Sequence, residues 1–163
     1  SPAMNFVSAI LQRDDAGGYL LRLGAETLQV PDSVFTARPA LASSAGKQVV
    51  VGMRPEDIED AAIAGSDSGR MLTATAELVE PLGSDVMVYL SVDVPQAVEH
   101  DDLAELARDS GDTPLDVGGK ATVIARFSPR SSVHVGEQVM IRIATDRLHF
   151  FEPQSGVAIW EAS

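Results

Sequence analysis

Short apolar runs, many alternating with a period of two and ended by Gly, Pro, Asp or Ser, dominate the sequence. Such runs are typical of strands with one buried face, and the residues between them are typical of tight turns. The expected strands cover residues 6–12, 19–23, 26–30, 49–51, 71–80, 85–92, 120–127, 138–143, 147–151 and 157–160. No stretch alternates strands with long helices, so no βαβ unit is expected. The sequence predicts an all-β chain, as a small barrel or a sandwich.

Three segments are expected to lie outside the strands. Residues 34–46 are rich in Ala, Ser and Pro and are expected to form a loop. Residues 59–70 are acidic and then rich in Gly and Ser, which predicts a flexible connector between two halves. Residues 99–116 contain seven acidic residues and one Arg. This acidic insert predicts one short helix, with Asp102 as N-cap and Glu105 three residues later. It is either a solvated surface or a docking surface for a basic partner.

Composition excludes several classes of function. The chain has 163 residues, enough for one domain or two small interlocked ones. The net charge of −12 argues against nucleic acid and anionic lipid as partners, because both attract clustered Lys and Arg. With no cysteine, disulfides, thiol catalysis and Cys-based zinc sites are excluded. No apolar run is long enough to span a bilayer. The first residue is Ser1, which suggests a piece of a longer protein.

Residues 49–58 are expected to form a rigid corner. Three valines indicate a buried strand, which breaks at Gly52. Pro55 fixes its own φ and pushes Arg54 toward an extended conformation, and Glu56-Asp57 follows. The corner is either a strand-ending turn with a local Arg–Glu ion pair, or a contact point for a partner or small ligand.

The sequence offers no motif for catalysis, and no catalytic, cofactor-binding or metal-binding residue is assigned. Neither Gly-Lys pair is followed by Ser or Thr, so a P-loop is excluded. The three histidines, His100, His134 and His149, are far apart and lack the spacing of metal ligands. No nucleophile elbow of the G-x-S-x-G type is present. The backbone amides of Leu82-Gly83-Ser84 remain a candidate anion-binding nest.

Several motifs in order resemble one family. They are Ser1-Pro2-Ala3-Met4-Asn5-Phe6, Gly52-Met53-Arg54-Pro55-Glu56-Asp57-Ile58, Glu80-Pro81-Leu82-Gly83-Ser84-Asp85, Val135-Gly136-Glu137, Asp146-Arg147-Leu148-His149-Phe150-Phe151 and Ser155-Gly156. This series resembles the C-terminal regulatory domain of ATP-binding subunits from carbohydrate-importing ABC transporters of the maltose, trehalose and glycerol-3-phosphate type. The long acidic insert resembles that of actinobacterial trehalose-type subunits. Asp57 stands where the family usually has His.

The resemblance implies a fold and a set of residues. The fold would be a pair of OB-type barrels, the transport-associated regulatory fold, within a single regulatory domain. One subdomain would comprise approximately residues 1–63 plus the C-terminal strands, and the other residues 70–130. The family-signature residues carried over are Gly52, Arg54, Pro55, Glu56, Leu82, Gly83, Gly136, Glu137 and Asp146. Within the corner, Arg54 to Glu56 would act as a fixed joint.

The resemblance also implies a function. The chain would be a non-catalytic regulatory and dimerisation module, without a cofactor of its own. ATP and Mg²⁺ would bind a separate N-terminal ATPase domain of a homodimeric transport ATPase. That parent subunit would lie on the cytoplasmic face of two membrane permeases, and an inhibitory protein or small ligand could act on the regulatory domain. The alternatives are a barrel that senses an oxyanion or a sugar, and a β-barrel enzyme.

Overall fold

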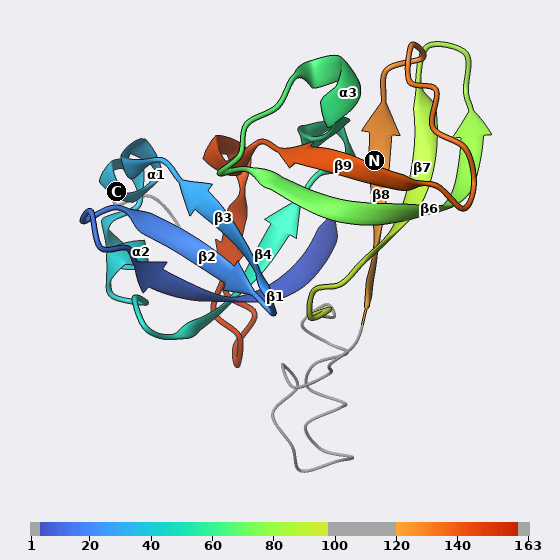
Figure 1. Ribbon diagram of the computed structural model, residues 1–163. Coiled ribbons are helices and arrows are strands. Elements are labelled where there is room, and N and C mark those ends of the chain that lie inside the picture. The colour runs from blue at the N-terminus through green and yellow to red at the C-terminus, as the bar shows by residue number, and fades with distance from the viewer. Residues whose placement is uncertain (1–3, 98–119, 160–163) are drawn as a thin grey trace.

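Two five-stranded antiparallel sheets form the computed structural model, which describes residues 4–97 and 120–159 (Figure 1). The first sheet, in the order β10-β4-β1-β2-β3, contains β1 (Asn5–Arg13), β2 (Tyr19–Leu23), β3 (Glu26–Val30), β4 (Gln48–Met53) and β10 (His149–Phe151). The second, in the order β5-β9-β6-β7-β8, contains β5 (Ile58–Asp60), β6 (Met71–Pro81), β7 (Val86–Val92), β8 (Ala121–Phe127) and β9 (Gln138–Ile143). The prediction of an all-β, OB-fold-like chain is confirmed.

The second sheet curls upon itself. Its two outer strands, β5 and β8, contact each other, and β8 also packs against the 3₁₀ turn η1 (Pro55–Asp57). Alternate residues of β7 point inward, as the period of two predicts, and contribute Val88 and Leu90 to the core. Most buried apolar residues of both sheets form one continuous cluster, and Val50 of β4 belongs to a second, smaller one. The two sheets therefore share a core.

In the described part of the chain, two connections run directly from a named strand of one sheet to a named strand of the other, and these two crossings touch. The first crossing runs from β4 through η1 into β5, and the second from β9 through the 3₁₀ turn η3 (Thr145–Arg147) into β10. The backbone N–H of Ala144 donates to the carbonyl of Asp57 at 3.0 Å, which ties the two crossings together. We call this region, η1 and η3 with the strand ends beside them, the joint.

Asn5 connects the sheets at a second place. Its Nδ2 donates to the carbonyls of Met53 (3.1 Å) and Ile124 (2.9 Å), and its Oδ1 accepts from the N–H of Ile124 (2.8 Å). The Asn5 side-chain amide thus bonds both the N–H and the carbonyl of Ile124, as a neighbouring strand would do on that edge of β8. Because Asn5 is buried, these hydrogen bonds are shielded from competing water.

Several predicted segments differ from the observed ones. Instead of a loop, the chain forms α1 (Asp32–Ala37), preceded by the N-cap residue Pro31, and α2 (Pro39–Ala42), which begins with proline. The predicted connector begins with the last residues of β5 and continues as α3 (Ala61–Ala64), which the Asp60 side chain caps. The last expected strand forms a single bridge from Ala158 to Phe151. The predicted helix and the whole acidic insert, residues 99–116, lie outside the described residues.

Candidate functional site

The expected corner is present at the end of β4. Arg54 is extended, with φ −78° and ψ 148°, and Pro55 is buried at the start of η1. The N–H of Asp57 donates to the Arg54 carbonyl at 3.0 Å and closes the turn. Glu56 is exposed. The corner turns the chain from one sheet into the other, so it is one half of the joint.

The ion pair at the corner is long-range, and the expected local Arg–Glu pair was wrong. Arg147 Nη1 lies 3.6 Å from Asp57 Oδ1. Asp57 is 6% exposed, whereas Glu56 points into solvent, where a carboxylate gains little from pairing. No ion pair of Arg54 with Glu56 is found within residues 4–97 and 120–159. The pair that forms therefore joins η1 to η3.

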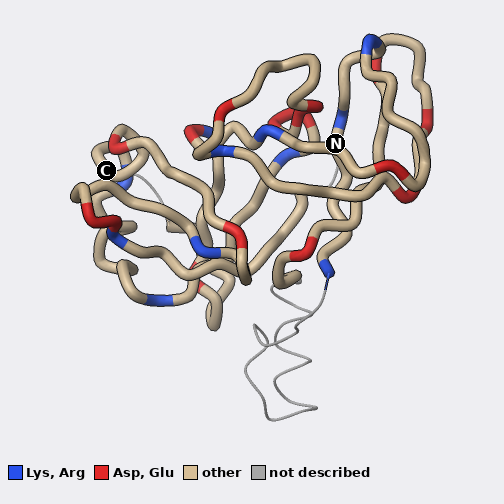
Figure 2. The backbone as a smooth tube through the Cα atoms, in the orientation of Figure 1, with Lys and Arg blue, Asp and Glu red and all other residues tan. Residues whose placement is uncertain are grey.

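The charges of Arg147, His149 and Arg54 act on the buried carboxylate of Asp57. Burial raises the pKa of Asp57, against the opposing effect of the Arg147 guanidinium. Burial lowers the pKa of His149, and the positive charges of Arg54 and then Arg38 lower it further. The negative charge of Asp57 acts in the opposite direction and raises the pKa of His149. We call these five residues, Arg38, Arg54, Asp57, Arg147 and His149, the joint cluster (Figure 2 shows the charged residues along the backbone).

We expect His149 to make the stability of the joint depend on pH. Its pKa in the folded state lies below the ordinary value of 6.5, so the unfolded chain binds more protons between the two values. The contribution of neutral His149 to the free energy of unfolding is fully present above pH 6.5. It is lost as the pH falls through the pKa that His149 has in the folded state. Urea unfolding at about pH 7.5, 6.5 and 5.5 should show wild type losing stability relative to His149→Gln. Parallel pH curves for the two proteins would contradict this.

The other family-signature residues lie on the second sheet or at the rim of the joint. Leu82 and Gly83 form the tip of the β6–β7 hairpin, where Gly83 has a φ of 89°. The Leu82 N–H donates to the Asp85 carbonyl at 2.8 Å, so it is already bonded and the proposed anion nest loses that donor. Gly136 and Glu137 hydrogen-bond through their backbones to Ala76 of β6. Asp146 is exposed in η3.

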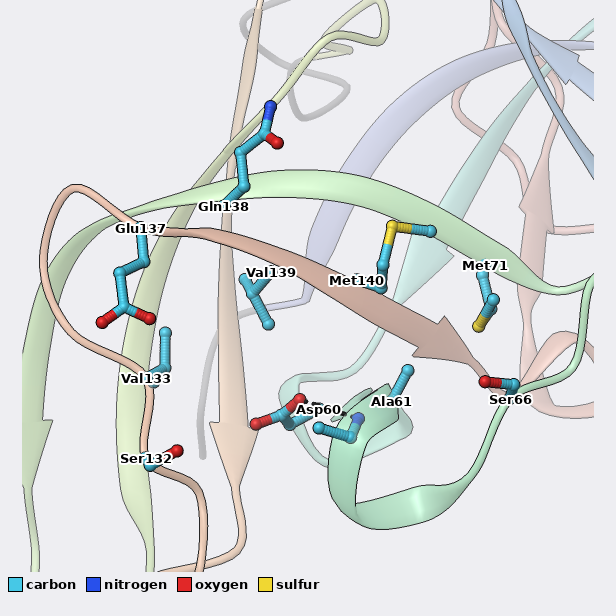
Figure 3. Close-up of a pocket in the computed structure, with 11 residues that line it drawn as sticks. Asp60, Ala61, Ser66, Met71, Ser132, Val133, Glu137, Gln138, Val139 and Met140 are labelled. Carbon is cyan, nitrogen blue, oxygen red and sulfur yellow. Dashed lines mark hydrogen bonds between the residues drawn. The ribbon is translucent and has the colours of Figure 1, made fainter.

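A pocket of about 350 Å³ lies between β9, α3 and the segment before β9 (Figure 3). Its lining residues are Asp60, Ala61, Ala62, Ser66, Met71, Ser132, Val133, Glu137, Gln138, Val139 and Met140. Asp60 accepts from the Ser131 hydroxyl (2.6 Å) and from the Ala62 N–H (3.0 Å), so its carboxylate is held in place. The pocket combines carboxylate, hydroxyl and amide groups with methionine and valine side chains.

Neither described histidine, His134 or His149, forms a catalytic group with a buried carboxylate and a nucleophile among the described residues. His134 Nδ1 lies 2.8 Å from Glu137 Oε1, but the two side chains are 76% and 52% exposed and only three residues apart. This is a local surface pair at the pocket rim. Within the described ranges, no group of three or more His, Asp or Glu residues could hold a metal ion. His149 belongs to the joint cluster.

Sequence reasoning missed several residues that the structure brings together. The sequence indicates Asn5 and Arg147 only as parts of motifs, although Asn5 bridges the two sheets and Arg147 joins η3 to η1. Asn5 is a polar residue at the start of an apolar strand, and this position could have indicated a structural role. Nothing in the neighbouring sequence indicates Ile124 as its partner. The sequence indicates Asp60 only weakly, as the N-cap of a helix, because it directly precedes the four apolar residues 61–64.

Comparisons with known proteins agree with the fold. Residues 1–58 match the family model described as the MalK OB fold domain. In the solved structure of the cytoplasmic molybdate-binding protein ModG, a chain superposes with a TM-score of 0.52 at 14% identity, covering 94% of this chain and 95% of that one. At that identity the likeness concerns the fold alone. No helix in the described part of the chain is long and apolar enough to cross a membrane.

Sequence relatives point to one group of transport proteins. The chain is 37% identical over 161 residues to the trehalose import ATP-binding protein SugC of Mycobacterium tuberculosis, covering 96% of this chain and 38% of the relative. It is 27% identical over 165 residues to the trehalose/maltose import ATP-binding protein MalK of Thermococcus litoralis, covering 98% and 35%. The chain thus spans little more than a third of these relatives. It is an OB-fold-type domain homologous to the ATP-binding subunits of ABC sugar importers.

Proposed function

We propose that the chain is the regulatory and dimerisation domain of the ATP-binding subunit of an ABC sugar importer. The observation that carries this proposal is the similarity along 96% of the chain to a subunit that is far longer than the chain. The rest of such a subunit would bind ATP and Mg²⁺ and hydrolyse the nucleotide. The chain itself would then need no cofactor. The parent subunit would form a homodimer and associate with membrane permeases at the cytoplasmic face.

The joint suits a regulatory role because it connects two sheets at a few defined contacts. Those contacts are the Asp57–Arg147 ion pair and the hydrogen bond from Ala144 to Asp57. A partner or ligand that binds one arrangement of the subunit more tightly than another makes that arrangement more populated. The size of the shift is set by the difference in binding free energy between the two arrangements, typically about 1–3 kcal/mol. In this mechanism the domain sets the resting separation of two ATPase domains.

The outer face of the second sheet is the surface we propose for dimerisation. Met140 on β9 and Leu78 on β6 are 42% and 44% exposed. Met140 lies opposite Thr73, and Leu78 lies opposite Tyr89, so both side chains belong to the face that turns away from the core. Contiguous apolar patches mark surfaces that another protein covers, and in this proposal Met140 and Leu78 belong to such a patch.

Sedimentation velocity over a range of protein concentrations tests this surface. We expect residues 1–163 to show a monomer–dimer equilibrium, and Met140→Lys to weaken it at least tenfold, because a charge would be buried without a partner. Leu82→Lys is the matched control, since Leu82 is exposed at the hairpin tip rather than on the sheet face. A chain that stays monomeric, or equal dimerisation in wild type and Met140→Lys, would rule out this surface.

A second candidate function is the sensing of a small hydroxylated ligand in the pocket beside β9. Its volume, about 350 Å³, is at the lower end of the range for small-molecule sites, about 300–1,000 Å³. The Asp60, Glu137 and Gln138 side chains offer acceptors and donors that suit sugar hydroxyls. Thermal-shift screening with disaccharides and glycerol phosphates tests this role, and the absence of a saturable shift with any of them would exclude those ligands.

A further inference from the structure

A buried carboxylate lies in the wall of the pocket beside β9. Asp60 lines this pocket and is only 6% exposed. On β5, Ile58 and Asp60 are buried and Glu59 between them is exposed, so Asp60 occupies a position that the period of two gives to a core residue. Within residues 4–97 and 120–159, Asp60 forms no ion pair. This is unusual, because a buried charge is ordinarily paired.

Neutral groups hold the Asp60 carboxylate in a fixed orientation. Its Oδ1 accepts from the Ala62 N–H at 3.0 Å, and its Oδ2 accepts from the Ser131 hydroxyl at 2.6 Å. An ionised carboxylate has about four lone-pair sites, so about half of its accepting capacity remains for a donor in the pocket. A charged donor there would form a charge-assisted hydrogen bond, which is roughly twice as strong as one between neutral groups.

A second carboxylate, an added hydroxyl and apolar side chains complete this wall of the pocket. Glu137 and Val139 are two residues apart, and Figure 3 shows both side chains on the same side of β9 as Asp60. Ser132 and Val133 belong to the segment before β9 and line the same pocket. The lining thus places two negative charges beside a hydroxyl group and two valine side chains.

The basic groups near the pocket do not offset these charges from its lining. No Lys, Arg or His lines the pocket in the described part of the chain. Arg142 on β9 donates from Nη1 to the Ala64 carbonyl at 3.0 Å, and Arg130 is exposed in the turn before Ser132. His134 meets Glu137 only as an exposed surface pair. The pocket therefore favours a cationic ligand and disfavours a phosphorylated one.

We propose that this pocket binds a small hydroxylated molecule that carries a protonated amino group, as an amino sugar does. Asp60 would accept from the ammonium group, Ser132 and Glu137 would bond hydroxyl groups, and Val133 and Val139 would contact the carbon skeleton. The volume of about 350 Å³ suits a ligand of monosaccharide size. This inference rests on the ligand-sensing role proposed for the pocket and narrows its ligand class, whereas it does not depend on the dimerisation role.

Titration calorimetry with protonated glucosamine, glucose and glucose 6-phosphate tests the ligand class. We expect glucosamine to bind saturably, and glucose to bind at least about tenfold more weakly because it forms no charged hydrogen bond with Asp60. Glucose 6-phosphate should bind more weakly still. Asp60→Asn should weaken glucosamine binding at least about tenfold and change glucose binding little. Glu59→Gln is the matched control, since it removes the same charge from the neighbouring, exposed position of β5.

The outcomes separate this inference from the ligand-sensing role. Glucose binding as tightly as glucosamine would keep a sugar-sensing pocket and overturn the preference for a cation. No saturable binding of any of the three would overturn both. If Asp60→Asn fails to fold, Glu137→Gln provides the comparison, because that side chain is 52% exposed, and it should weaken glucosamine binding more than glucose binding. Equal glucosamine binding by wild type, the pocket variants and Glu59→Gln would place the ligand elsewhere and contradict the inference.

Discussion

Replacing Asn5 with Ala is expected to lower the free energy of unfolding by about 3 kcal/mol, because three hydrogen bonds of a buried side chain are lost. The substitution leaves the Met53 carbonyl and both backbone groups of Ile124 without their partner. For a chain of this size the loss corresponds to a fall in melting temperature of roughly 6–12 °C. Urea unfolding and calorimetry measure both quantities.

Amide hydrogen exchange separates this effect from general loosening. The Ile124 N–H bonds to Asn5, so its protection in Asn5→Ala should fall more than that of other β8 amides. Gln138→Ala, which removes an exposed side-chain amide from a strand, is the matched control and should change stability by less than about 0.5 kcal/mol. A loss at Asn5→Ala no larger than that of the control would show that Asn5 does not hold the sheets together.

Replacing Gly52 with Val is expected to cost about 2–3 kcal/mol, through overpacking. Gly52 is buried in β4, between β1 and β10. A Cβ atom at this position would overlap the Met4 sulfur and would lie 3.1 Å from the Phe151 ring. That ring packs edge-on against Phe6, with centroids 5.6 Å apart, so a side chain at residue 52 would displace the aromatic pair. Chemical denaturation measures the loss.

A double-mutant cycle with Met4→Ala identifies the cause. Removing the Met4 side chain should recover part of the stability lost in Gly52→Val, since it removes the main overlap. Strictly additive effects of the two substitutions would mean that the overlap is not the reason for glycine at this position. The family motif at Gly52 would then need another explanation.

The sequence predicted most of the strands because their alternation is a local property. The runs at residues 19–23, 26–30 and 138–143 match the observed strands to the residue. The three-residue β5 is too short to show a period, and it forms through pairing with β9. The short helices α1 and α2 lie in a stretch whose Ala, Ser and Pro content suits a loop equally well. Their positions depend on packing, since Val34, Phe35 and Leu41 are buried.

The candidate site was predicted only in part, for the same reason. The turn at Arg54-Pro55 follows from local proline geometry, and it is observed. The partner of its carboxylate is Arg147, ninety residues away in the sequence, which no spacing rule indicates. The division into two subdomains rests on the family resemblance and stays a prediction. The same holds for the roles of the family-signature residues. The family resemblance itself is confirmed by the homologous import subunits.

The most direct test of the central claim is the oligomeric state of the whole ATP-binding subunit without nucleotide. Sedimentation velocity would compare the full subunit with a variant that lacks residues 1–163. The proposed role predicts that the full subunit remains a dimer without ATP, and that the shortened subunit dissociates into monomers under the same conditions. Equal association of the two proteins would contradict a dimerisation role for this domain.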